Sequence, residues 1–202
     1  MTPIYLASRS PRRRELLKQI GVRFDPLLLR LAGPRGADVD ELQHADEPAE
    51  RYVERTAREK AAFGAQVTRM RGMLPRPVLA ADTVVILDGE VLGKPADAAE
   101  ATRFLQRLSG RSHEVRTAVA VATEGPVLET LSVSTVRFRA LADDEIRRYI
   151  ASGEPFDKAG GYGIQGLAGA FVEHIEGSYT GIMGLPVFET AQLLAQIGVR
   201  VV

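Results

Sequence analysis

The chain lacks cysteine altogether and contains no long run of apolar residues. The absence of cysteine excludes a disulfide scaffold, thiolate zinc sites, iron–sulfur clusters and cysteine catalysis. No stretch approaches the ~18 apolar residues that a membrane span needs. The N-terminus, with a few apolar residues before a basic run, has the wrong order for a secretion signal. We therefore expect a cytoplasmic protein with no membrane partner.

Net charge is also absent, because 26 Lys and Arg residues balance 26 Asp and Glu residues. Without an excess of one sign the chain has no global field for nucleic acid or a membrane surface, and we expect neither as a partner. Lysine is scarce as well, since only four of the 26 basic residues are lysines. Such a chain is expected to keep lysine where a compact ammonium is required, with chance as the alternative.

The length of 202 residues predicts a single domain, residues 1–202, with a core of its own. Apolar strand patterns alternate with helical periodicity, and neither a repeat nor a linker interrupts them. The fold class is therefore mixed α/β. Strands are expected at 4–7, 78–87, 113–123, 127–139 and 170–175, and a turn at Asp88-Gly89 is expected to lead into a short strand before Gly93. Helices are expected at 11–20, 47–70, 97–108, 143–152 and 186–197, extended chain at 22–31, and loops at 32–46 and 153–169.

The segment from Ser8 to Arg13 is the first candidate site. It follows a strand and begins a helix that Ser10 is placed to cap, and free amides at a helix N-terminus attract anions. Arg12, Arg13 and Arg14 in the first turn oppose the helix dipole, at roughly 0.3–1 kcal/mol per charge. A bound polyanion would reverse that cost. Phosphate binding is therefore favoured over arginines that merely face solvent or pair with acids.

Asp82 is the second candidate, because it interrupts an apolar strand. A buried acid there must be paired, protonated or bound to a metal. The alternative is an acid that caps a strand end.

Two nucleotide-binding motifs are excluded. A formal Gly-x-Gly-x-x-Gly occurs at 161–166, but it follows a polar loop and precedes a strand, which is the wrong context for a dinucleotide site. The phosphate-binding Gly-x-x-x-x-Gly-Lys motif is absent. The histidines are scattered without the spacing of metal ligands.

Six motifs in order make the chain resemble the Maf family, from about Ile4 to Leu194. They are Ser8-x-Ser10-Pro11-Arg12-Arg13, Ala81-Asp82-Thr83, Gly93-Lys94-Pro95, Leu108-Ser109-Gly110-x-x-His113, Asp157-Lys158-Ala159-Gly160-x-Tyr162-Gly163-Ile164-Gln165-Gly166 and Gly184-Leu185-Pro186. The resemblance implies a mixed twisted sheet with flanking helices and two lobes around a central cleft, as in inosine triphosphatase-like folds. It also implies a cytoplasmic nucleoside triphosphate pyrophosphatase, a divalent cation (Mg²⁺ or Mn²⁺) and a homodimer.

The resemblance also implies roles for individual residues. Asp82 is expected to be the proton acceptor that activates water, and Glu41 and Asp82 the metal ligands. The expected phosphate-binding residues are Ser8, Ser10, Arg13, Lys60 and Lys94. Three of the four lysines thus fall in motifs, counting Lys158, which supports the expectation that lysine is retained for a purpose.

Substrate choice is expected to depend on Arg12, Thr83 and Gln165. The resemblance implies that Maf proteins preferring 7-methyl-GTP have tryptophan at the position of Arg12. An arginine would repel a cationic purine that a tryptophan face attracts. The amide of Gln165 offers a donor and acceptors, which suits the O4 and N3–H edge of thymine and uracil. We therefore expect hydrolysis of normal or modified pyrimidine nucleotides, dTTP and UTP. The alternatives are 7-methyl-GTP or other purine nucleotides as substrate, or a nucleotide-binding regulator of septum formation.

Overall fold

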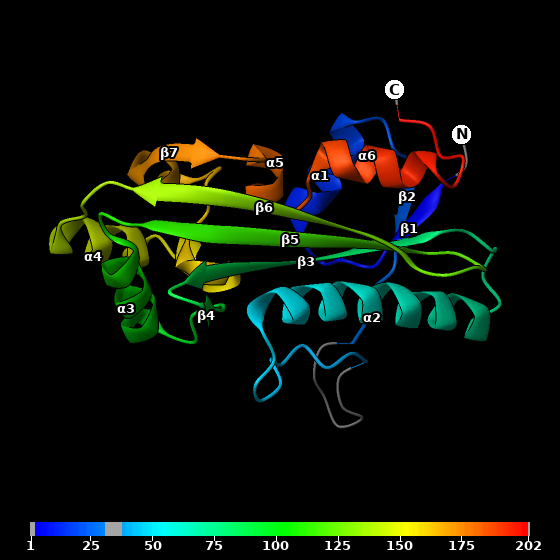
Figure 1. Cartoon of the computed structure of the whole chain (residues 1–202), viewed down its shortest axis with the longest axis horizontal. Coiled ribbons are helices and arrows are strands. Elements are labelled where there is room, and N and C mark those ends of the chain that lie inside the picture. The colour runs from blue at the N-terminus through cyan, green and yellow to red at the C-terminus, as the bar shows by residue number, and fades with distance from the viewer. Residues whose placement is uncertain (1–2, 31–37, 202) are drawn as a thin grey trace. The chain divides into compact units, whose positions relative to one another are not determined.

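The computed structural model describes residues 3–30 and 38–201 and confirms a mixed α/β fold with helices flanking a sheet (Figure 1). The part of the expected loop that falls at 32–37 lies outside the described residues. Within the described ranges the strands form one sheet in the order β2-β1-β3-β5-β6-β7, and β4 pairs with β3. No helix in these ranges offers the length of apolar surface that a bilayer crossing requires.

The sheet is mixed. Strand β1 pairs in parallel with β2 and β3, whereas β3 with β4 and β6 with β7 are antiparallel. The strands are β1 (Ile4–Leu6), β2 (Phe24–Pro26), β3 (Val78–Leu87), β4 (Glu90–Leu92), β5 (Ser112–Ala122), β6 (Leu128–Phe138) and β7 (Val172–Glu176). The α-helices are α1 (Pro11–Gln19), α2 (Ala49–Met70), α3 (Ala98–Leu108), α4 (Asp143–Ala151), α5 (Tyr179–Met183) and α6 (Val187–Ala195). The 3₁₀-helices are η1 (Glu154–Asp157), η2 (Ala159–Gly161) and η3 (Leu167–Phe171).

Most elements lie where the sequence pattern predicts them, and three differ. Of the extended segment expected at 22–31, the described residues 22–30 contain only the short strand β2, which Pro26 ends because proline cannot donate to a sheet. The loop at 153–169 contains 3₁₀ turns, the form that short helical pieces commonly take. Helix α5 was not expected, because five residues carry no usable periodicity.

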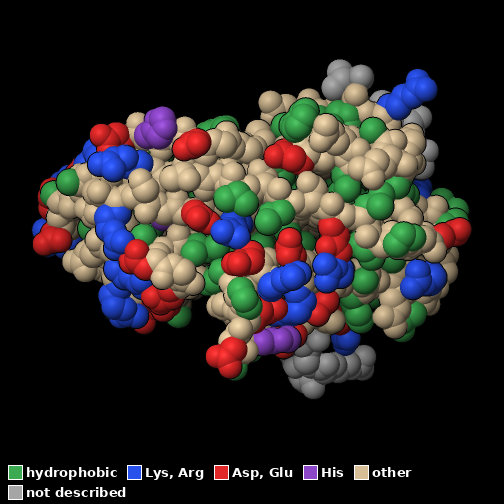
Figure 2. Space-filling view, in the orientation of Figure 1, with side chains coloured by type: hydrophobic (Ala, Val, Ile, Leu, Met, Phe, Trp, Pro, Cys, Tyr) green, Lys and Arg blue, Asp and Glu red, His purple; other side chains and the backbone are tan. Residues whose placement is uncertain are grey.

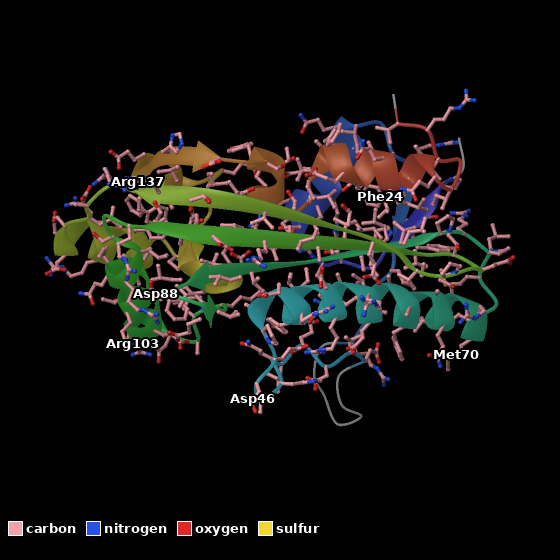
Figure 3. The ribbon with its side chains drawn as sticks, in the orientation of Figure 1. Phe24, Asp46, Met70, Asp88, Arg103 and Arg137 are labelled. Carbon is pink, nitrogen blue, oxygen red and sulfur yellow. The ribbon has the colours of Figure 1, made fainter. Side chains whose placement is uncertain are left out.

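Two local predictions from turn chemistry are confirmed. Ser10 caps α1, since its Oγ accepts a hydrogen bond from the backbone N–H of Arg13 at 3.4 Å, and Gly21 ends the helix region with φ +73°. Asp88 and Gly89 form the β3–β4 turn with φ values of +54° and +80° (Figure 3).

The chain divides into two compact units. Unit 1 comprises Met1–Asp82, Thr117–Ser132 and Gly184–Val202, and unit 2 comprises Thr83–Arg116 and Val133–Met183. Because both units are assembled from alternating segments, no single cut in the sequence separates them. The single domain expected for residues 1–202 stays a prediction.

Each unit has its own core. In unit 1, α2 covers one face of the strands while α1 and α6 cover the other (Figure 1). Buried aliphatic residues such as Ile4, Leu6 and Leu79 fill the space between them. In unit 2 the core is aromatic: the rings of His113, Phe138 and Tyr162 meet edge to face, with centroids 4.8 to 5.4 Å apart.

Candidate active site

Asp82 lies in the middle of β3, where four buried residues precede it and four follow Thr83. Its side chain is 14% exposed, and Oδ1 accepts a hydrogen bond from Lys60 Nζ at 2.9 Å. Of the three states expected for a buried acid there, which are paired, protonated or bound to a metal, the structure shows the paired one, with a cation as the partner. The alternative, an acid that caps a strand end, is wrong because the strand continues for five residues beyond Asp82.

Lys60, on α2, joins the two acids that were expected to bind metal. Its ammonium donates to Glu41 Oε2 at 2.8 Å as well as to Asp82, although its own side chain is only 12% exposed. Two carboxylates thus converge on a single sheltered cation. Because unlike charges attract strongly where water is scarce, this arrangement holds all three side chains together.

Close packing of α2 against the sheet brings Lys60 within reach of Asp82. Gly64 lies one turn further along the same helix face, and a Cβ placed there would be 2.8 Å from Val78 Cγ1. The buried face also includes Ala57 and Ala61, which add little bulk. A helix with larger residues on this face would lie further from β3, and Lys60 would have further to reach.

The segment from Ser8 to Arg13 forms a compact turn after β1. Ser8 Oγ accepts hydrogen bonds from the backbone N–H of Ser10 at 3.2 Å and from Arg13 Nη1 at 3.3 Å. Arg13 Nε donates to the carbonyl oxygen of Gly184 at 2.7 Å. Burial lowers the pKa of the Arg13 guanidinium below its ordinary value, and the nearby charges of Asp82 and Glu41 act in the opposite direction. Arg13 therefore belongs to the same electrostatic cluster as both acids.

Glu41 is held in place by side chains that the sequence did not single out. Tyr52 OH donates to the carbonyl oxygen of Glu41 at 2.8 Å. Arg55 donates to the carbonyl oxygens of Asp40 at 3.1 Å and Leu42 at 2.8 Å. Together these bonds fasten the backbone on both sides of Glu41 to α2.

An ion pair completes this fastening. Arg55 Nε lies 2.7 Å from Glu47 Oε1, and the hydrogen bonds from Arg55 hold the pKa of Glu47 at about 2. The pKa of Tyr52 is raised to about 12, first by burial and then by the charges of Asp82 and Glu41. Figure 2 shows basic and acidic side chains interleaved over α2 and the segment before it. From the sequence alone, Tyr52 and Arg55 look like residues of a solvent-exposed helix face. Nothing in the sequence distinguishes them from ordinary surface residues.

Three of the remaining predicted residues, Thr83, Lys94 and Gln165, belong to unit 2. Lys94 is exposed in the irregular segment after β4, and Gln165 is exposed between Gly163 and Gly166. Thr83 is half-buried in β3, next in the chain after Asp82. Arg12 is half-buried on α1. The roles expected of all the predicted site residues, in either unit, stay predictions.

A backbone hydrogen bond joins the segment that carries Lys94 to the segment that leads to Gln165. The backbone N–H of Gly160 donates to the carbonyl oxygen of Gly93 at 2.9 Å. Gly160 has φ +68°, and a Cβ there would lie 2.9 Å from a methyl group of Val85. Only glycine fits this position, which explains the glycine beside the Asp-Lys-Ala sequence.

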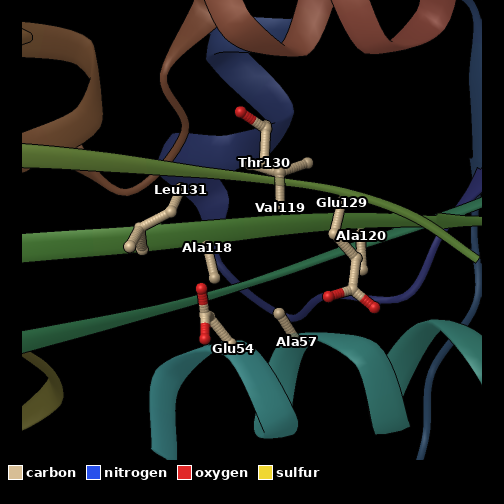
Figure 4. A pocket seen from close by; sticks show the side chains of 8 residues that line it. All are labelled: Glu54, Ala57, Ala118, Val119, Ala120, Glu129, Thr130 and Leu131. Atoms are coloured by element: carbon tan, nitrogen blue, oxygen red, sulfur yellow. The ribbon is translucent and has the colours of Figure 1, made fainter. Parts of the chain in front are cut away.

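A small hollow in unit 1 is a poor alternative site. It has a volume of about 200 Å³ and lies between α2 and strands β5 and β6 (Figure 4). Ligand pockets usually measure about 300–1,000 Å³. Glu54 and Glu129 place carboxylates in its lining, which would repel a triphosphate, and none of the predicted site residues lines it.

The described residues contain no cluster of three or more His, Asp or Glu side chains that could hold a metal ion. The two acids expected to bind a cation, Glu41 and Asp82, are both paired with Lys60. Mg²⁺ commonly binds proteins through only one or two carboxylates and completes its shell with water and substrate phosphates. Two carboxylates are a small set of ligands, but carboxylate oxygen is the ligand type that Mg²⁺ prefers.

Comparison with known proteins gives evidence independent of this geometry. Three curated relatives share more than half their residues with this chain and are each named dTTP/UTP pyrophosphatase. They come from Aromatoleum aromaticum (58% identity, covering 96% of this chain and 95% of the relative), Chromobacterium violaceum (57%, 98% and 96%) and Nitrosomonas europaea (53%, 98% and 96%).

Among solved structures, the Staphylococcus aureus Ham1 protein matches with a TM-score of 0.44 and 16% identity, covering 70% of this chain and 73% of that one. A likeness of this size is too weak to support a conclusion. The family model described as Maf-like protein, by contrast, matches residues 3–197. The chain is therefore a member of the Maf family.

Proposed function

We propose that this protein hydrolyses dTTP and UTP to the nucleoside monophosphate and pyrophosphate, and so removes normal or modified pyrimidine nucleotides. The observation that carries the proposal is the placement of Lys60 between Glu41 and Asp82, with Arg13 in the same cluster. The relatives named dTTP/UTP pyrophosphatase match this chain over nearly its whole length.

Basic residues hold the triphosphate in this proposal. Arg13 presents a planar fork suited to phosphate oxygens, while Lys60 and Lys94 act as point charges. The hydroxyls of Ser8 and Ser10 line the turn that leads into α1. Phosphoryl transfer depends mainly on positioning and on stabilising charge, so a preformed set of donors is the main requirement.

Asp82 is the general base. Its Oδ1 accepts from Lys60, and its second carboxylate oxygen makes no hydrogen bond to any residue that the structure describes. That oxygen can take a proton from water as the water oxygen bonds to the α-phosphorus. The bond between the α-phosphorus and the bridging oxygen then breaks, and pyrophosphate leaves with the bonding electron pair.

Glu41 and Asp82 would hold a divalent cation, Mg²⁺ or Mn²⁺. The two carboxylates already converge on one positive charge, the ammonium of Lys60, so their placement fits a cation. When bound, the metal would neutralise charge on the phosphate oxygens.

Arg12, Thr83 and Gln165 select the base. The Gln165 amide can donate to O4 and accept from N3–H of uracil or thymine, whereas cytosine reverses donor and acceptor on that edge. A site that hydrogen-bonds its substrate rejects a mispaired analogue strongly, because buried polar groups are left unpaired.

The test is a nucleotide panel. Purified protein with Mg²⁺ is given dTTP, UTP, CTP, GTP and 7-methyl-GTP, and release of pyrophosphate is measured. We expect kcat/KM for dTTP and UTP to exceed that for CTP at least about tenfold. A preference for 7-methyl-GTP or GTP would contradict the pyrimidine assignment. Tight binding without turnover would instead support a regulator.

A cytoplasmic location and a homodimer also stay predictions. Fractionation of the cells that make the protein, and its mass in solution, would test them.

A further inference from the structure

We propose that Glu154 is a positioning residue for base recognition, because its carboxylate fixes the backbone that carries Gln165. This inference rests on the pyrimidine specificity proposed above and adds the group that makes Gln165 selective. The residues involved all belong to unit 2.

The carboxylate of Glu154 occupies the inside of the bend that runs from Gly163 to Ala168. Oε2 accepts from the backbone N–H of Leu167 at 2.9 Å, and Oε1 accepts from that of Ala168 at 3.4 Å. Tyr149 OH donates to Oε1 at 3.0 Å. The carboxylate therefore has neutral donors as partners, two of them from the chain just beyond Gln165.

Lys158, the cation closest in sequence, does not pair with this carboxylate. Its Nζ donates to the backbone carbonyl oxygen of Glu154 at 2.7 Å and to Asp157 Oδ1 at 2.5 Å. The lysine thus fastens the start of the segment, and the side chain of Glu154 is left to bind the bend.

The glycines on both sides of Gln165 show how closely the backbone lies on this support. A Cβ at Gly166 would overlap the carboxylate of Glu154, with its Cδ only 2.5 Å away. A Cβ at Gly163 would lie 2.7 Å from Cε of Lys158. Tyr149 OH also accepts from the backbone N–H of Gly163 at 3.3 Å. Glu154 and Tyr149 therefore hold the bend before and after Gln165.

A fixed backbone matters because an amide can present either its oxygen or its nitrogen. Discrimination between uracil and cytosine requires one orientation, and a loosened bend would let Gln165 satisfy both bases. Replacing Glu154 by glutamine keeps the shape of the side chain but turns one acceptor oxygen into a donor. At least one of its three partners then loses its acceptor.

The experiment compares kcat/KM for UTP and CTP in the wild type, Glu154→Gln and Glu145→Gln. We expect Glu154→Gln to lower the UTP-to-CTP ratio at least about fivefold, mainly through KM for UTP. Inhibition by added pyrophosphate should stay unchanged, because phosphate binding does not involve Glu154. Glu145→Gln is the matched control: it breaks an ion pair with Arg139 in the same unit, and it should leave the ratio unchanged.

An unchanged ratio in Glu154→Gln, or an equal fall in Glu145→Gln, would overturn the proposal. If Glu154→Gln does not fold, Tyr149→Phe removes the hydroxyl shared by Glu154 and Gly163 and must lower the ratio by a smaller factor; an unchanged ratio there would also overturn it. A wild type that releases no pyrophosphate, or selects no base, would overturn the proposed function as well. If the wild type is selective and its UTP-to-CTP ratio is the same in Glu154→Gln and Tyr149→Phe, only the role of Glu154 is overturned.

Discussion

The segment around Glu41 and the segment around Gln165 are both irregular chain, yet they are fixed by different means. Charge holds the first: Arg55 pairs with Glu47 and grips the carbonyl oxygens of Asp40 and Leu42. Close backbone packing and neutral N–H donors hold the second, around the carboxylate of Glu154. The first region brings charged side chains together, and the second fixes the backbone that carries Gln165.

This difference fits the two separate tasks of the proposed reaction, binding the triphosphate and selecting the base. A triphosphate is the same polyanion whatever the base, so a charged cluster serves every nucleotide equally. A base edge is neutral and differs only in the order of donors and acceptors, so it needs one rigid amide. Changes in the charged cluster should therefore lower kcat/KM for UTP and CTP together, whereas changes around Gln165 should lower it for UTP and so alter the UTP-to-CTP ratio.

The largest effect is expected from Asp82→Asn. Loss of the base should lower kcat about 10²–10⁴-fold while nucleotide affinity stays within about tenfold. Pyrophosphate release and equilibrium nucleotide binding measure the two quantities. Asp88→Asn is the matched control, because Asp88 is an exposed acid that pairs with Arg111 at the β3–β4 turn. Turnover at the wild-type rate in Asp82→Asn would remove Asp82 from the mechanism.

Arg55→Ala should have the next largest effect. Without the guanidinium the backbone around Glu41 loses its bonds to α2, and misplacement of about 1 Å can cost on the order of 10²-fold in rate. We expect kcat/KM for UTP and CTP to fall together by about ten- to a hundredfold. Arg58→Ala, which removes a cation of the same helix paired with Glu129, should change neither. A change in the UTP-to-CTP ratio in Arg55→Ala would contradict the division of tasks.

The aromatic core of unit 2 should make stability depend on pH. Burial lowers the pKa of His113 to about 4, while the unfolded chain takes up the same proton near its ordinary value of 6.5. Between these values the unfolded state binds more protons, so the free energy of unfolding falls as pH falls. At pH 5 the loss is roughly 2 kcal/mol relative to neutral pH.

Denaturant unfolding at pH 7.5 and pH 5.0 measures this dependence. His113→Gln should lose it, whereas His174→Gln should keep it because His174 is exposed. His113 Nε2 also shares a hydrogen bond of 2.7 Å with Tyr162 OH. An identical pH dependence in His113→Gln and the wild type would assign the effect to other groups.

The smallest effect is expected from Gly64→Ala. Overpacking against Val78 costs about 1–3 kcal/mol, and better helix propensity returns about 1 kcal/mol. The free energy of unfolding should fall by about 1 kcal/mol, and the longer reach from Lys60 to Asp82 should lower kcat slightly. Gln66→Ala, at an exposed position of α2, should stay within about 0.5 kcal/mol of the wild type. A more stable Gly64→Ala would show that α2 can move away from the sheet.

Local signals in the sequence predicted much of this architecture. The cap at Ser10 and the turn at Asp88-Gly89 follow from bonds within a few residues, and both are confirmed. An acid inside an apolar strand is expected to be paired, protonated or bound to a metal, and the structure shows that Asp82 is paired.

Other features depend on contacts that no local pattern encodes. The Arg13 guanidinium reaches the carbonyl oxygen of Gly184, 171 positions away in the chain. Tyr52 and Arg55 look like ordinary polar residues of a helix until the segment they hold is seen. Glu154 precedes a proline in a glycine-rich stretch without periodicity, so its role as the support of a bend is visible only in the structure.

In this account the charged cluster sets the rate and the segment around Gln165 sets base selectivity. The most direct test is the UTP-to-CTP ratio of kcat/KM in one variant of each region. kcat/KM for UTP and CTP is measured in the wild type, Lys60→Ala and Gln165→Ala. Lys60→Ala should lower both values at least about tenfold and keep their ratio within about twofold, because its partners are the shared acids Glu41 and Asp82. Gln165→Ala should lower the value for UTP about tenfold or more and leave that for CTP nearly unchanged. A shifted ratio in Lys60→Ala, or an equal fall for both nucleotides in Gln165→Ala, would contradict the account.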